Sequence, residues 1–337
     1  MGEYRNIPFF VPFAGCPNRC VFCAQEKITG HGVCEDNSCE LNALESLLES
    51  VPRGTGCESR IAFFGGSFTA IPRARMEGLL ASAREYINKG VASGIRISTR
   101  PDCINEEILD ILADYGVCNI ELGIQSTDDN VLAASGRGHD AKCSFRAAEL
   151  ITGRGFTLGG QMMIGLPGAT PESELATARD IVAMGAAESR IYPTVVFSGT
   201  ELYRMAVSGC YKPLSDTEAV RRTAPCFRLF YESGVKVLRI GLHASEETVS
   251  APFGATHPAI GELVRGQVYA DIIAGKVGDA GGKTLVITVK KSDVSMLCGH
   301  GGRAIAAIKS ATNATAVRVI GGDRECFDPL INFGSVK

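Results

Sequence analysis

Short runs of apolar and β-branched residues alternate along the first part of the chain with longer segments of helical periodicity. The apolar runs lie at 7–13, 60–66, 95–101, 119–126, 158–167 and 189–197. The helix-period segments between them lie near 41–51, 73–89, 104–115, 128–152 and 171–184. A strand followed by a helix, repeated about six times, is typical of parallel βαβ units. The pattern therefore predicts an α/β fold built around a parallel sheet.

The pattern loosens after residue 197. A helix near 216–233 and a strand at 235–242 are expected to complete a main body over residues 1–242. Residues 243–280 form a glycine-rich connecting segment with a helix expected at 258–275. A small α+β unit is expected over 281–337, because the runs "KTLVITVKK" and "AVRVI" flank the helical segment "RAIAAIKSAT".

Composition narrows the class of protein. The 337 residues are 45% hydrophobic and 21% charged, an ordinary balance for a globular chain. No apolar run approaches a membrane span and the N-terminal MGEYRN has no apolar signal core, so we expect a cytoplasmic protein without a membrane partner. Thirteen cysteines in such a chain favour a reducing compartment over a disulfide scaffold.

Charge is distributed unevenly along the chain. The formal net charge of −3 excludes a uniformly basic surface for nucleic acid. Residues 281–325 nevertheless hold seven Lys or Arg against three acids, a local balance of +4 that leaves −7 for the remainder. This asymmetry indicates a separate role for the C-terminal unit.

The stretch "GCPNRCVFC" (15–23) places Cys16, Cys20 and Cys23 directly after the first apolar run. A structural zinc site needs four ligands, and the fourth could come from His31, Cys34 or Cys39, although none belongs to a second paired motif. Iron–sulfur clusters are held by cysteine thiolates, and three thiolates on a four-iron cluster would leave one iron open. An open coordination position is a feature of catalytic metal sites.

Further polar motifs stand in or after the later apolar runs, most of them at strand ends, where functional groups gather in βα folds, and one, "RGH", after the helix that follows 119–126. "FFGGSFT" supplies Gly65 and Gly66, which let a ligand lie against the backbone, and then Ser67. "STRPD", "ELGIQS", "RGH" and "QMMIGLPG" supply Ser98, Gln125, Arg137 and Gln161. Gln161 stands in an apolar strand, where a buried amide needs either a structural partner or a ligand.

A CxxxCxxC motif in the loop after the first strand resembles the radical S-adenosylmethionine (SAM) superfamily. The resemblance implies a partial (β/α)6 TIM-type barrel, here followed by the small α+β C-terminal extension. It also implies a [4Fe–4S] cluster on Cys16, Cys20 and Cys23, whose remaining iron chelates SAM. Reductive cleavage of SAM then gives a 5′-deoxyadenosyl radical, with a protein such as flavodoxin or ferredoxin as the reductant.

The same resemblance implies roles for the polar motifs. Gly65, Gly66 and Ser67 are similar to the GGE-type motif that meets the methionyl amine, with serine in place of the usual acid. By likeness to enzymes of the oxygen-independent coproporphyrinogen oxidase type, four residues match polar positions around bound SAM: Ser98, Gln125, Arg137 and Gln161. Ser98 falls where a ribose-binding acid usually sits. No residue is implied as the catalytic group that reacts with substrate.

The combination of FFGGSFT, STRPD, ELGIQS, RGH and MMIGLPG is similar to the radical SAM half of the Elongator catalytic-subunit family, over roughly residues 5–265. This resemblance implies tRNA, or another RNA, as partner and uridine as the base modified. The family usually has a longer cysteine spacing and an acetyltransferase domain, and we find no acetyl-CoA loop here. Acetyl-dependent carboxymethylation is therefore not carried over.

The C-terminal unit contains "LCGHGGRAIAAI", in which Gly299, His300, Gly301 and Gly302 precede a helix. This arrangement resembles a KH module, whose GXXG loop clamps a nucleic-acid backbone. Glycines admit close approach, helix N–H groups face phosphate, and Arg303 and Lys309 add positive charge. A glycine-rich strand–helix turn without a ligand is the alternative, because GXXG patterns are common.

Together these features predict a radical SAM enzyme that modifies RNA. Two alternatives stay open. One is a radical SAM enzyme acting on a small molecule such as a porphyrinogen, and the other is a non-catalytic iron–sulfur protein that binds RNA. Turnover of SAM to 5′-deoxyadenosine separates an enzyme from a binding protein, and retention of RNA separates the two enzymes.

Overall fold

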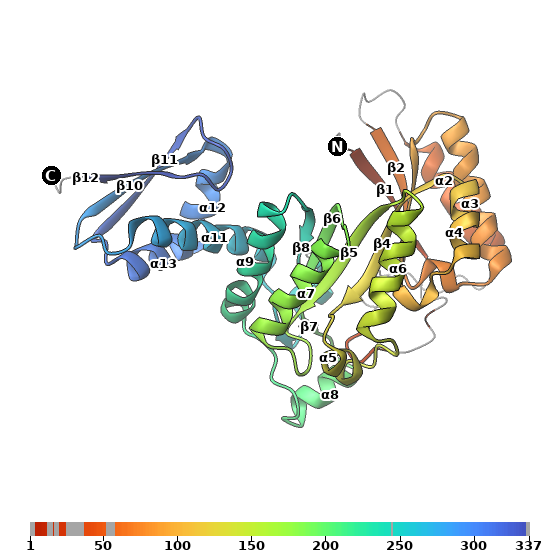
Figure 1. Cartoon of the computed structure of the whole chain (residues 1–337), viewed down its shortest axis with the longest axis horizontal. Helices are drawn as coiled ribbons and strands as arrows, with labels where there is room; N and C mark the ends of the chain where they lie inside the picture. The colour runs from red at the N-terminus through yellow and green to blue at the C-terminus, as the bar shows by residue number, and fades with distance from the viewer. Residues whose placement is uncertain are drawn as a thin grey trace.

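The computed structural model describes residues 4–11, 16, 20–24, 37–51, 58–243 and 245–334. Its main body is a seven-stranded sheet in which all neighbouring strands are parallel (Figure 1). In spatial order the strands are β1 (Tyr4–Val11), β2 (Glu58–Gly65), β3 (Gly94–Thr99), β4 (Val117–Gln125), β5 (Thr157–Ile164), β6 (Glu188–Pro193) and β8 (Lys236–Ile240). Spatial order follows chain order, as in a TIM barrel rather than a doubly wound sheet, and β1 and β8 are both edges. The predicted partial barrel is therefore confirmed.

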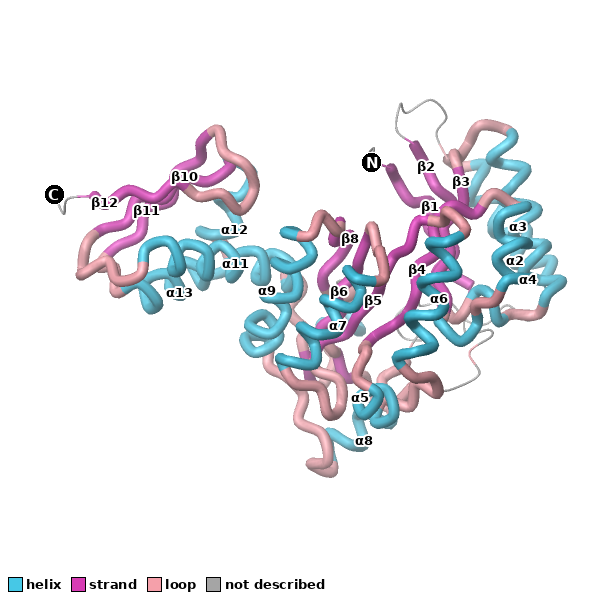
Figure 2. The backbone as a smooth tube through the Cα atoms, in the orientation of Figure 1, coloured by secondary structure: helices cyan, strands magenta, loops and turns pink. Residues whose placement is uncertain are grey.

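Helices follow the strands and cover the outer face of the sheet (Figure 2). They are α2 (Asn37–Glu49), α3 (Arg73–Asn88), α4 (Glu106–Asp114), α6 (Ala141–Gly153), α7 (Pro171–Ala183) and α9 (Asp216–Glu232), whereas α5 (Asp129–Ala134) lies beyond the end of β4 (Figure 2). None of the helices among the described residues is both long and apolar enough to cross a membrane.

The two faces of the sheet differ in chemistry because successive side chains of a strand point in opposite directions. On β4, Ile120, Leu122 and Ile124 are fully buried in the main hydrophobic core. The alternate residues Glu121 and Gln125 instead line a cavity on the inner face. One face therefore binds the helices, and the other carries the functional groups.

The helical segment predicted at 128–152 is two helices, α5 and α6. Asp128 caps α5 by accepting hydrogen bonds from the N–H groups of Asn130 and Val131. After α5 the Arg137 N–H donates a hydrogen bond to the Leu132 carbonyl at 3.0 Å. Asp140 is then the N-cap of α6. These local hydrogen bonds interrupt the helical periodicity and place Arg137 in a loop.

Smaller elements also differ from the expectation. The run predicted as one strand at 189–197 becomes β6 and β7 (Val195–Val196), and β7 pairs antiparallel with β9 (Phe253–Gly254). Two short helices, α8 (Glu201–Val207) and α10 (Glu246–Val249), were not predicted.

The C-terminal unit is a three-stranded sheet packed on helices. Its strands, in the order β11-β10-β12, are β11 (Ala316–Gly322), β10 (Thr284–Lys290) and β12 (Leu330–Gly334), of which β12 was not predicted. β10 runs parallel to β11 and antiparallel to β12. Its helices are α11 (Ile260–Val277), α12 (Val294–Cys298) and α13 (Arg303–Thr312), with α11 and α13 along one face of the sheet (Figure 2).

Helix α11 joins the C-terminal unit to the barrel. Its residues Val264 and Val268 belong to the main core, whereas Tyr269 and Ile273 belong to the core of the C-terminal unit. The Tyr269 hydroxyl donates to Asp293 at 2.6 Å, which fixes the helix against the small sheet.

Candidate active site

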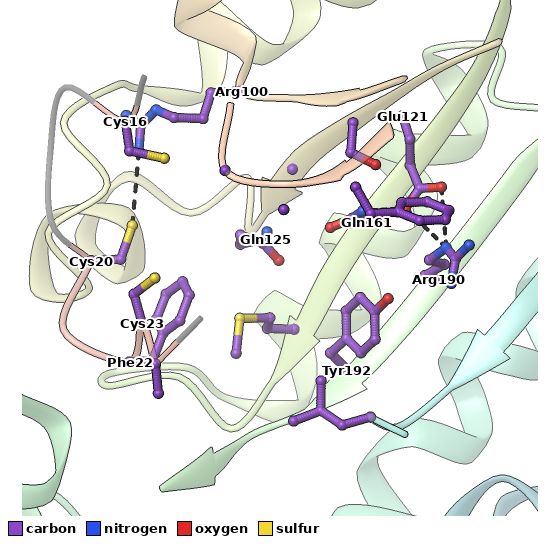
Figure 3. A pocket seen from close by; sticks show the side chains of 18 of the residues that line it. Cys16, Cys20, Phe22, Cys23, Arg100, Glu121, Gln125, Gln161, Arg190 and Tyr192 are labelled. Carbon is purple, nitrogen blue, oxygen red and sulfur yellow. Dashed lines mark hydrogen bonds and ion pairs between the residues drawn. The ribbon is translucent and has the colours of Figure 1, made fainter. Parts of the chain in front are cut away.

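A cavity of about 600 Å³ lies on the inner face of the partial barrel. Cys16, Cys20 and Cys23 stand on one side of it and Arg190 and Tyr192 on the other (Figure 3). The lining also includes all but one of the residues predicted to contact SAM, namely Gly65, Gly66, Ser98, Gln125, Arg137 and Gln161. The fold thus gathers motifs from four strands and two loops around one space.

The three predicted cluster ligands share this cavity. Cys20 is buried, Cys23 is half-buried and Cys16 is exposed. The Cys20 sulfur lies 3.3 Å from Arg137 Nη1 and 3.8 Å from Arg100 Nη1. These two guanidinium groups place positive charge beside the Cys20 sulfur. The positive surroundings and the three thiols fit an anionic, thiolate-bound cluster.

A single-ion site is not formed by the same residues. Across the described parts of the chain, no group of three or more His, Cys, Asp or Glu side chains is placed to hold one metal ion. The cysteines of a four-iron cluster bind different irons, so their sulfurs need not converge on one atom. Of the possible fourth zinc ligands, Cys39 is exposed on α2 and does not line the cavity, whereas His31 and Cys34 lie outside the described residues.

The end of β2 requires glycine. Gly65 has a φ of +125°, and a Cβ there would collide with the carbonyl oxygen of Val11 on β1. The Gly66 N–H contacts the same oxygen at 3.4 Å. Because both glycines line the cavity without side chains, a ligand can approach their backbone closely.

Ser67, unlike Gly65 and Gly66, does not line the cavity. Its side chain is fully buried, lies 2.8 Å from the Thr99 hydroxyl and accepts from the Arg100 N–H at 3.2 Å. The hydroxyl thus ties the end of β2 to the end of β3, and contact between Ser67 and SAM stays a prediction.

Three buried polar atoms at the cavity have no hydrogen-bond partner in the described structure, namely Ser98 Oγ, Gln125 Oε1 and Arg137 Nε. All three side chains are more than nine-tenths buried. Gln125 also has a φ of +70°, which is uncommon for a non-glycine residue. An unpaired buried polar group costs about 1–3 kcal/mol, so three together are typical of a site that a polar ligand completes. The ammonium, carboxylate and ribose hydroxyls of SAM fit these atoms chemically.

Gln161 is held by a charge network that the sequence did not predict. Its amide donates to Glu121, which also receives the Arg96 guanidinium at 2.6 Å and Arg190 Nε at 2.9 Å. Burial alone would raise the pKa of the Glu121 carboxyl, but Arg190 and Arg96 together outweigh burial and hold that pKa below its usual range. Glu121 is therefore an ionised carboxylate that fixes the inner wall of the barrel.

The Gly299–Gly302 loop of the C-terminal unit connects α12 to α13. The short helix α12, between β10 and this loop, was not predicted. Gly301 and Gly302 have φ values of +69° and +71°, and a Cβ on either would meet open space. Gly301 is exposed, and Gly299, His300 and Gly302 are half-buried. The loop leads into the N-terminus of α13, where N–H groups favour an anion.

The side chains beside this loop combine opposite charges. Arg303 and Lys309 are exposed on α13. His300 Nε2 lies 2.7 Å from Glu262 on α11, and its ring packs edge-on against His257. His300 is therefore tied to α11, and the exposed charges nearby are Arg303, Lys309 and the Glu262 carboxylate that contacts His300.

Comparison with known proteins assigns the family. The profile of the radical SAM superfamily matches residues 10–181, and that of the Radical_SAM C-terminal domain matches residues 187–270. The chain belongs to the radical SAM superfamily. The first match covers β2 to most of α7 and contains the three cysteines, while the second extends into α11.

Two curated relatives each match more than half of the chain. An uncharacterized Methanocaldococcus jannaschii protein, MJ0486, is 30% identical over 231 residues, covering 65% of this chain and 70% of its own. The tRNA uridine(34) acetyltransferase of Dehalococcoides mccartyi is 25% identical over 231 residues, covering 59% of this chain but only half of its own length. The chain is thus similar to the radical SAM region of Elongator-type proteins and not to their whole length.

A solved structure shows the same fold. The archaeal Elp3 of Methanocaldococcus infernus superposes with a TM-score of 0.60 at 21% sequence identity. The match covers 78% of this chain and 62% of the archaeal chain. At this identity the likeness supports the partial barrel and leaves the reaction to be argued from the site.

The unpaired polar atoms lead to a prediction for SAM binding. We expect Gln125→Ala and Arg137→Ala each to weaken SAM binding by about 1–3 kcal/mol, because each leaves polar groups of the ligand unpaired. Iron content should not change in Gln125→Ala. Isothermal titration of anaerobic, iron-loaded protein measures the difference, and wild-type affinity in both variants would remove these residues from the SAM site.

Proposed function

We propose that the chain is a radical SAM enzyme with one [4Fe–4S] cluster, held by Cys16, Cys20 and Cys23, and that its substrate is RNA. The enzyme and cluster assignment is supported by one observation: three thiols and three unpaired polar atoms lie around one cavity, in a chain of this superfamily. A uridine of tRNA is the first candidate for the base modified. A small reductant protein such as flavodoxin or ferredoxin is the proposed electron donor.

When bound, the cluster and SAM would supply a 5′-deoxyadenosyl radical able to abstract a hydrogen atom from the substrate. The chain's own residues would bind and orient these groups. Arg100 and Arg137 place positive charge beside the Cys20 sulfur, which offsets the negative charge of thiolates. The Gly65 and Gly66 backbone would face the methionyl amine.

Apolar side chains complete the cavity and would protect a reactive radical. Phe22, Phe64 and Met163 line it beside the polar groups. Apolar side chains keep water away from the reacting atoms. Tyr192 also lines the cavity, and burial raises the pKa of its hydroxyl, which therefore stays neutral.

Two observations support RNA as the substrate. A relative that covers more than half of this chain is named as a tRNA uridine(34) acetyltransferase. The C-terminal unit also presents a GXXG loop in which Gly301 is exposed, with the exposed Arg303 and Lys309 on the helix that follows. Phosphate oxygens could approach the loop N–H groups there, as in KH modules.

The GXXG loop gives a prediction for RNA affinity. We expect Gly301→Asp to weaken binding of labelled tRNA at least about tenfold, roughly 1.4 kcal/mol, because the new side chain blocks the backbone and repels phosphate. Binding by the unmodified chain should weaken as salt concentration rises. A fluorescence-anisotropy titration at two salt concentrations measures both effects.

A matched control separates RNA contact from backbone strain. Gly281→Asp places the same residue at a similar positive φ, +58°, in the turn before β10, where a Cβ also meets open space. It should bind tRNA like the wild type, and both variants should keep their iron. Equal tRNA affinities of Gly301→Asp and wild type, or no binding by either, would leave the loop structural and favour a small-molecule substrate.

A further inference from the structure

The cavity wall opposite the cysteines contains an arginine whose charge is not offset. The other arginines of this region are paired with carboxylates. Arg96 lies 2.6 Å from both Glu121 and Glu188, and Arg190 lies 2.9 Å from Glu121. These two arginines and two carboxylates form a neutral network, seen in part at Glu121 and Arg190 in Figure 3.

Arg239 lies outside this network. It stands on β8 and lines the cavity. Its Nε donates to the Gly241 carbonyl at 2.9 Å, its Nη2 donates to the Leu242 carbonyl at 3.2 Å, and its Nη1 lies 3.1 Å from His243 Nε2. These neutral partners orient the guanidinium without cancelling its charge. No carboxylate pairs with it in the part of the chain that the structure describes.

The groups around Arg239 are donors as well. His243 also lines the cavity, and burial, together with Arg239 and Arg190, lowers the pKa of its imidazole. A neutral His243 accepts from Arg239 at Nε2 and keeps an N–H at Nδ1. Tyr192, on the neighbouring strand β6, adds a protonated hydroxyl. Arg239 has five N–H groups and uses three in the contacts above, so two remain for a ligand.

We propose that Tyr192, Arg239 and His243 form a subsite for an anionic oxygen group of the substrate, either a phosphate or a carboxylate. Such a group would pair with the charge of Arg239 and accept hydrogen bonds from its two remaining N–H groups, from His243 Nδ1 and from the Tyr192 hydroxyl. The planar guanidinium matches both oxyanions. This inference rests on the proposed function, because the subsite would hold a substrate between this wall and the cysteines. It names the chemistry that the substrate must carry.

The test compares small probes on the full-length, iron-loaded chain with SAM present. Equilibrium dialysis would measure the binding of three probes. Uridine carries no anionic group, uridine 5′-monophosphate carries a phosphate, and orotate carries a carboxylate. We expect at least one anionic probe to bind tenfold or more tightly than uridine. Preference for the monophosphate identifies a phosphate subsite, and preference for orotate identifies a carboxylate subsite.

Variants assign that preference to Arg239. Arg239→Gln should remove the advantage of the anionic probe, whereas Arg239→Lys, which keeps the charge, should retain part of it. Arg221→Gln is the matched control, because Arg221 is exposed on α9 and pairs with Glu218. The subsite is refuted if uridine binds as well as both anionic probes, if no probe binds, or if Arg239→Gln keeps the wild-type preference.

Failure of this inference is distinguishable from failure of the proposed function. Iron content and the production of 5′-deoxyadenosine from SAM by the reduced wild type report on the proposed function alone. A protein that makes 5′-deoxyadenosine but shows no anion preference would retain the first proposal and lose this one. Folding of the variants is checked by their iron content.

Discussion

Replacing Cys20 with serine is expected to leave a protein without its iron and its brown colour. Wild-type protein purified without oxygen should hold about four irons per chain, and the variant should hold almost none, because an alcohol replaces a thiolate ligand. Cys16→Ser and Cys23→Ser should behave alike, since all three thiols line one cavity. Iron and sulfide assays with the visible absorption spectrum measure the loss.

Cys39→Ser is the matched control for the cysteine variants. Cys39 is exposed on α2 and is not part of the cavity, so this variant should keep the wild-type iron content. Cys34 lies outside the described residues, and Cys34→Ser is expected to keep its iron as well. Stoichiometric zinc without iron in the wild type would contradict the assignment.

Loss of the Glu121 charge is expected to give the largest change in stability. Glu121→Gln should lower the free energy of unfolding by about 3–5 kcal/mol, because Arg190 loses its carboxylate and Arg96 keeps only Glu188. Both Glu121 and Arg96 are almost fully buried. Urea unfolding of the iron-free proteins measures the shift without a contribution from the cofactor.

The exposed pair of Arg73 and Glu107 provides the comparison. Glu107→Gln should change the free energy of unfolding by less than about 1 kcal/mol, because both side chains are largely in solvent. Lowering the pH should also reduce the free energy of unfolding more in the wild type than in Glu121→Gln. A carboxyl with a depressed pKa stabilises the fold above its unfolded pKa, and this contribution is lost as pH falls through the folded pKa. Equal stability of wild type and Glu121→Gln would contradict the role of the network.

The sequence predicted the main architecture because the barrel is built from local patterns. Each strand of the main sheet begins and ends within a few residues of its apolar run. Helix α13 has the predicted bounds, Arg303 and Thr312. The prediction failed where hydrogen bonds between nearby residues override periodicity, as at Asp140, which starts a second helix inside the segment predicted as one.

The candidate site could be predicted where its signal is a motif. The cysteine spacing indicated the three thiols, a strand-end motif indicated Gln125, and the motif after the next helix indicated Arg137. Arg96 and Glu121 were missed because their partners stand on other strands, and only the register of the sheet brings them together. Charged residues inside apolar runs were the available signal for this network. Likewise, the cavity position of Arg239 depends on the pairing of β8 with β6, which places Arg239 beside Arg190.

The central claim is that this cavity performs reductive cleavage of SAM. The most direct measurement incubates anaerobic, iron-loaded protein with dithionite and SAM and quantifies 5′-deoxyadenosine by liquid chromatography and mass spectrometry, with Cys20→Ser as the background. The account predicts 5′-deoxyadenosine that accumulates with time in the wild type and in Cys39→Ser, and none above trace in Cys20→Ser. Iron-loaded wild-type protein that produces no more 5′-deoxyadenosine than Cys20→Ser would contradict it.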